Sequence, residues 1–138
     1  MMRSFLFLLA IGAMPAGLAA QEFQVVAHAA TSVSSVSPGE LSDVFLKKVT
    51  KLGGAAVAPV DQAKASPIRA AFTKRVHGRA VSAVDAFWQQ QIFSGGDSPP
   101  ATKPSDDEVL AFVKSTPGAI GYVSAGAATA GVKVVTVK

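Results

Sequence analysis

The residues best placed to do chemistry lie at the start of an expected helix. Ser66 and Pro67 follow the short apolar run 55–60 and the polar turn 61–65. Serine is a good N-cap and proline suits the first helical position, so the pair predicts a helix that begins at Pro67. A helix start presents free backbone N–H groups and the positive end of the helix dipole, which favour a small anion. The Ser66 hydroxyl is therefore a candidate anion donor, although most helix starts bind only water.

A second group of hydroxyls lies in segment 29–37, AATSVSSVS, after the expected first strand. The candidate ligands in it are Thr31, Ser32, Ser34 and Ser35. Hydroxyl and N–H groups near the carboxyl ends of strands in an open α/β sheet suit a small oxyanion. The segment can equally be a polar connection that binds nothing. Arg69, one turn into the helix that begins at Pro67, can supply a positive charge unless its side chain points into solvent.

Little in the chain predicts catalysis or a metal. The sequence has no Cys and two His, His28 and His77, so neither a thiol nucleophile nor a zinc site is expected. We interpret His77 as a favourable charge near a helix C-terminus. Ser66 lacks the Gly-x-Ser-x-Gly turn of a hydrolase nucleophile. The sequence therefore predicts no enzyme and no cofactor.

Three clustered carboxylates have a simpler explanation than chemistry. Asp106, Asp107 and Glu108 follow Ser105, with Glu three positions after Ser, which is the pattern of a capping box. The helix dipole favours negative charge in a first turn. We therefore interpret the cluster as the start of a helix.

Helices and strands alternate around these residues. Strands are expected at 23–28, 55–60, 119–123 and 132–137, and helices are expected to begin near Pro38, Pro67, Val81 and Asp106. Segment 95–104 has the composition of a loop. The alternation predicts one α/β domain, with a mainly parallel or mixed sheet flanked by helices.

The expected first helix carries the densest group of positive charges. Leu41, Val44, Phe45 and Val49 recur at helical spacing, so this helix is predicted to have one apolar face. Lys47, Lys48 and Lys51 are predicted to form a solvated face of the same helix. No aromatic residues are interleaved with these lysines, so no nucleic-acid partner is expected.

Segment 1–20 predicts export. It has one charge, Arg3, then an apolar core at 5–11 and small residues near its end, which are typical of a signal peptide and too short for a membrane span. Cleavage after Ala19 and cleavage after Ala20 both remain open. Because the sequence has no Cys for lipid attachment, we expect a soluble periplasmic or secreted protein that is neither a lipoprotein nor inserted in the membrane after cleavage. Segment 21–138 is expected to be the single domain, and removing Arg3 from the 13 basic residues leaves a net charge of +3 against 9 acidic ones.

Three segments, in this order, resemble the substrate-binding proteins of phosphate ABC transporters. Residues 41–51 (LSDVFLKKVTK) are similar to the family's "L…IFlGkit.W" segment, and residues 60–72 (VDQAKASPIRAAF) are similar to its "v.R…SGT…F" anion loop. Residues 117–123 (PGAIGYV) match its "pGAIGYv" segment closely. The resemblance covers nearly all of the chain after the export signal. It implies one lobe of a periplasmic binding protein, with phosphate or a similar oxyanion as ligand and a membrane permease as partner.

The departures from the family lie at the ligand itself. In the family, an Arg four residues before the loop Ser and the Ser-Gly-Thr sequence bind the oxyanion. Here Gln62 stands at the position of that Arg, and Ser66-Pro67-Ile68 replaces Ser-Gly-Thr. Full-length members have two lobes, and this chain has room for one.

Two functions therefore remain open at this point. The first is a periplasmic oxyanion-binding domain, with Gln62, Ser66, Arg69 and the hydroxyls of segment 29–37 as its ligands. The second is an envelope interaction or accessory module outside transport, which keeps the fold and has a degenerate ligand site.

Overall fold

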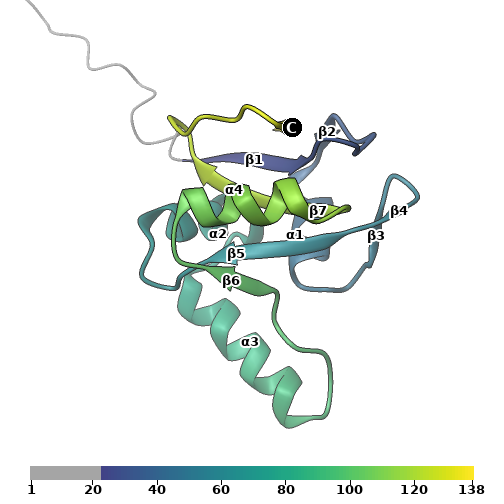
Figure 1. The fold of residues 1–138 in the computed structure, drawn as a ribbon. Helices are drawn as coiled ribbons and strands as arrows, with labels where there is room; N and C mark the ends of the chain where they lie inside the picture. Colours follow the sequence, from purple (N-terminus) through teal and green to yellow (C-terminus); the bar gives the residue numbers. More distant parts are fainter. Residues whose placement is uncertain (1–22) are drawn as a thin grey trace, which may run out of the picture.

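The computed structural model describes residues 23–138, which form a mixed sheet with helices on both faces (Figure 1). The four helices are α1 (Pro38–Phe45), α2 (Pro67–His77), α3 (Val81–Phe93) and α4 (Asp106–Ser115). The eight strands are β1 (Phe23–His28), β2 (Ser35–Val36), β3 (Lys51–Leu52), β4 (Ala55–Ala56), β5 (Ala58–Gln62), β6 (Ala101–Lys103), β7 (Ala119–Ser124) and β8 (Val132–Val137). The predicted α/β class and all four predicted helix starts are confirmed.

Six of the strands form the main sheet, in the order β2-β8-β1-β7-β5-β6. Strand β1 runs antiparallel to both of its neighbours, whereas β5 runs parallel to β6 and β7, and β2 runs parallel to β8. Strands β3 and β4 form a separate hairpin. The parallel half of the sheet carries the helical connections, so its carboxyl edge is the edge that concerns function.

Each face of the sheet has its own core. Helices α1 and α2 cover one face, where Phe72 stacks on Tyr122 with ring centroids 3.9 Å apart and both rings are fully buried. Helix α4 covers the other face and packs Val109 against Val60. Gly121 lies beneath this contact, and a Cβ there would come within 2.6 Å of Val60, so only glycine lets α4 lie this close to the sheet.

Helix α3 stands away from the sheet (Figure 1). It is attached through a small cluster in which Val84 and Trp88 pack against Leu46, just beyond the end of α1. Phe87 completes this contact, with its ring centroid 5.1 Å from that of Trp88. On its flank, Asp85 is ion-paired with Lys64 at 2.8 Å.

The expected strand 55–60 is wrong in its boundaries. Gly53 and Gly54 both have positive φ, of 59° and 83°, and make the tight turn of the β3–β4 hairpin. The apolar run therefore divides at Val57, and β5 extends to Gln62. The predicted loop 95–104 likewise contains β6, which was not expected.

The expected first helix is too long in the prediction. Helix α1 ends at Phe45, and Lys47 follows with a φ of 55°, which turns the chain so that Leu46 packs against α3. Val49 is consequently 40% exposed rather than part of an apolar face. The predicted lysine face of α1 does not exist, because Lys47 lies beyond the end of the helix and Lys51 lies in β3.

The helix caps follow the sequence closely. Ser37 and Glu40 form a complete capping box at α1, which was not predicted. At α4, Ser105 caps the backbone N–H of Glu108 at 3.3 Å, which confirms the serine half of the predicted box. The expected export signal lies outside the described residues, and no helix in residues 23–138 is long and apolar enough to cross a membrane.

Candidate functional site

The carboxyl ends of three parallel strands meet at one edge of the sheet. Strand β5 ends at Gln62, β6 ends at Lys103 opposite it, and β7 ends at Ser124. Helices α2 and α4 begin just beyond this edge, on opposite faces of the sheet. In open α/β sheets this is the place where ligands bind.

Gln62 lies at the centre of this edge and is 3% exposed. Its Nε2 donates to Oδ1 of Asp106 at 2.7 Å and to the backbone carbonyl of Tyr122 at 3.1 Å. Its Oε1 accepts a hydrogen bond from the Ser66 hydroxyl at 3.0 Å. The Gln62 amide therefore has a partner for each of its bonding groups and joins the starts of α2 and α4.

The Asp106 carboxylate accepts hydrogen bonds from three donors at this edge. Besides Gln62 Nε2, it accepts the backbone N–H of Ser124 at 3.1 Å and the Ser124 hydroxyl. These three donors come from the ends of β5 and β7. The side chain of Asp106 is therefore the acceptor for these donors.

The start of α2 is satisfied in the same way. Ser66 Oγ accepts the backbone N–H groups of Ile68 at 3.2 Å and Arg69 at 3.4 Å, while its own proton goes to Gln62. Pro67 has no N–H to offer. The predicted cap at Ser66 is confirmed, and the donors of the first turn are already used within the chain.

Arg69 points into the protein rather than into solvent. It is 6% exposed; its Nη1 donates to the backbone carbonyl of Gln62 at 2.9 Å, and its Nη2 lies 3.9 Å from Oδ2 of Asp61. The charge that was expected to replace the missing arginine is therefore paired with Asp61. The guanidinium of Arg69 therefore bonds to the backbone of Gln62 and pairs with Asp61.

Tyr122 and Asp61 complete the buried network behind the edge. The Tyr122 hydroxyl donates to Asp61 Oδ1 at 2.6 Å and accepts the backbone N–H of Gln62 at 3.1 Å. Burial raises the pKa of Tyr122 far above its usual value, with the Asp61 charge adding to the effect, so the hydroxyl keeps its proton. Burial also raises the pKa of Asp61, and the Arg69 charge opposes that rise. The network holds β5, β7 and α2 in one arrangement.

The hydroxyl segment 29–37 does not approach Ser66. Its residues Ser35 and Val36 form β2, which pairs with β8 at the far edge of the sheet from β5 and β6. Four strand spacings separate β2 from β5, about 19 Å at roughly 4.8 Å each. The segment instead bonds to β8, with the carbonyl of Thr31 accepting from Lys133 and that of Ser34 accepting from the backbone of Thr136.

The predicted group of ligands is thus divided by the fold. Gln62, Ser66 and Arg69 lie together, whereas Thr31, Ser32, Ser34 and Ser35 do not join them, because β1 runs antiparallel to β7. The carboxyl end of β1 therefore lies at the opposite end of the strands from the carboxyl ends of β5 and β7. The expectation that the hydroxyls of segment 29–37 share one site with Ser66 was wrong for this reason.

The interpretation of His77 as a charged residue was also wrong. Burial lowers the pKa of His77 to about 4, with Arg79, Arg69 and Lys48 adding in that order, so the ring is neutral at pH 7. Its Nδ1 lies 2.7 Å from the Ser42 hydroxyl, which joins α2 to α1. His77 therefore contributes a hydrogen bond between helices rather than a charge–dipole contact.

A groove of about 380 Å³ lies elsewhere, at the amino end of β5. Its lining includes Lys47, Pro59, Asp97, Pro100 and Phe112. Since it lies at the opposite end of β5 from Gln62, it is not part of the carboxyl edge. Within residues 23–138, no group of three or more His, Cys, Asp or Glu side chains is placed to hold a metal.

The sequence analysis missed four members of the network. It treated Asp106 only as a first-turn residue, and it assigned no role to Asp61, Tyr122 or Ser124. Ser124 was recognisable in principle, because it directly follows a predicted strand and so lies at a strand end. No sequence signal placed Asp106 next to it.

The comparisons with known proteins agree on the fold. A putative substrate-binding protein of a phosphate ABC transporter from Clostridium perfringens, solved with bound phosphate, matches with a TM-score of 0.66 and 18% identity. The match covers 84% of this chain and 44% of that one. An ABC-type phosphate transport receptor from Vibrio cholerae matches with a TM-score of 0.63 and 20% identity, over 83% of this chain and 45% of that one.

A possible phosphate-binding protein from Planctomyces limnophilus also matches, with a TM-score of 0.61 and 14% identity, over 85% of this chain and 41% of that one. The chain thus spans less than half the length of these proteins and has the fold of one lobe. The expected resemblance in fold is confirmed. No family model matches the sequence, and no curated protein does.

Proposed function

We propose that this chain is an envelope interaction or accessory module, which keeps one lobe of a phosphate-binding protein but does not carry phosphate. The observation that carries this proposal is the position of Asp106. Its carboxylate accepts hydrogen bonds from Gln62, from the Ser124 backbone and from the Ser124 hydroxyl. The acceptor that a ligand would supply is therefore a permanent part of the chain.

Two physical effects oppose an incoming oxyanion at this edge. The first is loss of donors, because each bond that phosphate would accept must first be taken from Asp106 or Gln62. The second is repulsion: two unit charges 4 Å apart cost about 4 kcal/mol near a protein surface. A single lobe also leaves its ligand partly open to water, whereas ligand pockets gain affinity by burying most of the ligand.

Calorimetry with phosphate and with sulfate tests the proposal. We expect no heat of binding from the wild-type protein at millimolar anion. Asp106→Asn removes the charge while its amide can still bond to Gln62 and Ser124, so this variant should gain weak binding, on the order of 1 mM or about −4 kcal/mol. Asp107→Asn is the matched control, because it removes the same charge from an exposed residue in the same turn and should gain nothing.

Oxyanion binding is the second candidate, and one observation favours it. Ser66 caps the start of α2 at the carboxyl edge. The fold around it is similar to that of proteins of phosphate transport. Tight phosphate binding by the wild-type protein, with a dissociation constant well below 1 mM, would establish this candidate and overturn the accessory module. Equal behaviour of the Asp106→Asn and Asp107→Asn variants would show that the Asp106 charge does not close the site.

A further inference from the structure

The groove at the amino end of β5 has the dimensions of a small-molecule site. It is formed where the turn after α1, the start of β5, the loop before β6 and helix α4 meet. Its volume of about 380 Å³ lies within the range of ligand pockets, roughly 300–1,000 Å³. The side chains that line the groove indicate which ligand fits it.

The walls of the groove are mainly apolar. They are formed by Val49, Val57, Pro59, Pro100 and Phe112. Val49 is 40% exposed, which is unusual for a large apolar side chain of this domain. Walls of this kind stabilise an apolar ligand group by removing it from water.

Two opposite charges also line the groove, Lys47 and Asp97. Lys47 Nζ and Asp97 Oδ1 are 3.9 Å apart, which is too long for a hydrogen bond. The exposed pair of Lys64 and Asp85, in contrast, is closed at 2.8 Å. Asp97 Oδ1 accepts the backbone N–H of Ser98 at 2.8 Å, which holds the carboxylate in place. The ammonium group of Lys47 and the carboxylate of Asp97 can therefore both bond to a ligand.

The backbone at Lys47 indicates a role for its side chain. Within residues 23–138, Lys47 is the only residue other than glycine with a positive φ, at 55°. It follows Leu46, the C-cap of α1, at a position where helices usually have Gly or Asn. A lysine destabilises the fold there, and backbone strain of this kind is concentrated at functional sites. A ligand contact made by the lysine side chain would explain this strain.

The two charges together select the type of ligand. A ligand with only a carboxylate would be attracted by Lys47 and repelled by Asp97, and a ligand with only an ammonium group would meet the reverse. A zwitterion satisfies both, because its carboxylate lies next to the lysine and its ammonium group lies next to the aspartate. An apolar side chain on the same molecule would then lie against the walls of the groove.

From these observations, we propose that the groove binds a zwitterionic α-amino acid with an apolar side chain, such as phenylalanine. Lys47 Nζ donates to the ligand carboxylate, Asp97 accepts from the ligand ammonium group, and Phe112 contacts the ligand side chain. The groove lies at the opposite end of β5 from Gln62. The inference therefore goes beyond the proposed function and does not depend on it.

Titration with L-phenylalanine, followed by NMR of the backbone amides, tests this site. We expect a dissociation constant on the order of 1 mM, because the groove is open to solvent. The amide signals of Val49, Thr50 and Ala101 should shift, whereas those of Gln62 and Ser124 should not. Phenylpropionate, which lacks the ammonium group, and phenylethylamine, which lacks the carboxylate, should each bind at least about tenfold more weakly.

Substitution of the two charged residues gives a second readout. Lys47→Gly removes the ammonium group and relieves the strain of a positive φ. It should weaken phenylalanine binding at least about tenfold, while the midpoint of thermal unfolding stays at or above that of the wild type. Asp97→Asn should weaken binding by a similar factor.

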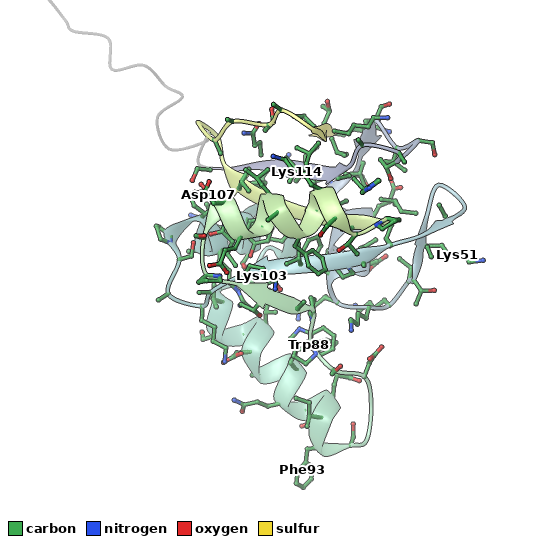
Figure 2. All side chains as sticks on the ribbon, viewed as in Figure 1. Lys51, Trp88, Phe93, Lys103, Asp107 and Lys114 are labelled. Atoms are coloured by element: carbon green, nitrogen blue, oxygen red, sulfur yellow. The ribbon has the colours of Figure 1, made fainter. Side chains whose placement is uncertain are left out.

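The controls remove the same charges from exposed residues outside the groove. They are Lys51→Gln and Asp107→Asn, and both should leave phenylalanine binding unchanged. Figure 2 shows Lys51 pointing away from the protein, although it lies only four residues after Lys47.

Several outcomes would overturn the proposal. One is the absence of phenylalanine binding at roughly 20 mM. A second is binding of phenylpropionate or phenylethylamine as tight as that of phenylalanine, because one charge would then suffice. A third is equal binding by the wild type, Lys47→Gly and Asp97→Asn, because the site would then lie elsewhere. None of these measurements uses phosphate, so failure at the groove is distinguishable from failure of the closed anion site.

Discussion

The carboxyl edge of the sheet and the outer face of α3 differ in what they leave unused. At the carboxyl edge, Gln62, Ser66 and Asp106 look like a ligand site, yet they satisfy one another with hydrogen bonds. On α3, Gln90 and Phe93 belong to no recognisable motif, yet they are exposed and outside any contact of the domain. The residues that resemble a ligand site thus bond to one another, whereas the exposed residues of α3 match no motif.

This difference shows that the resemblance of residues to a ligand-binding motif is weaker evidence for binding than the hydrogen bonds that those residues make. The resemblance in fold is confirmed, and strand ends and helix starts follow from the fold. Whether the edge binds a ligand depends on which donors remain free. Asp106, which accepts these donors, lies outside the three segments that carry the resemblance. Function belongs to the site rather than to the fold.

The largest expected difference between the two regions comes from removing a carboxylate from each of them. Asp61→Ala leaves the guanidinium of Arg69 and the hydroxyl of Tyr122 buried without their acidic partner, so it should lower the free energy of unfolding by about 4 kcal/mol. Asp85→Ala, on α3, breaks an exposed pair with Lys64 and should cost about 0.5 kcal/mol. Urea denaturation of both variants measures the difference. Similar costs would mean that the network behind the carboxyl edge is not the rigid element described here.

A second test loosens α3 instead of the sheet. Trp88 is 4% exposed and holds α3 to Leu46, so Trp88→Ala should cost about 3 kcal/mol by leaving a cavity. The loss should be local, because the cluster is separate from the two cores of the sheet. Hydrogen exchange should therefore accelerate in α3 while β1 and β7 keep their protection.

The control for this test is Ile92→Ala, since Ile92 is 58% exposed and should contribute little to stability. If Trp88→Ala accelerated exchange throughout the sheet, α3 would be part of the main core.

The sequence predicted the helices well because their signals are local. Ser66-Pro67 and Ser105 are caps that act over three or four residues, and both mark helix starts in the structure. The end of α1 was missed because Leu46 leaves the helix to pack against α3, a contact with a segment about 40 residues away. The short strands β2 and β6 were missed for the same reason, since each exists only through pairing with a distant strand.

The site could be predicted only in part. Gln62, Ser66 and Arg69 are neighbours in sequence, and they are neighbours in the structure. The hydroxyl segment was misplaced because nothing in the sequence states that β1 runs antiparallel to β7. The inward direction of Arg69 depends on Asp61, and the closure of the edge depends on Asp106, so both follow from pairings that only the fold creates.

The smallest test compares two serine caps, one inside the closed edge and one outside it. Ser66→Ala removes a cap from α2 and also removes the donor to Gln62 Oε1, whereas Ser105→Ala removes only a cap from α4. A lost cap costs about 1 kcal/mol, so Ser105→Ala should lower stability by that amount and Ser66→Ala by somewhat more. Thermal unfolding of the two variants checks the order. If Ser66→Ala costs less than Ser105→Ala, the bond to Gln62 adds nothing, and the edge is less fully satisfied than its geometry indicates. If wild-type protein bound phosphate and Ser66→Ala bound it equally well, the binding would lie away from α2, and the comparison would have to be drawn at another surface.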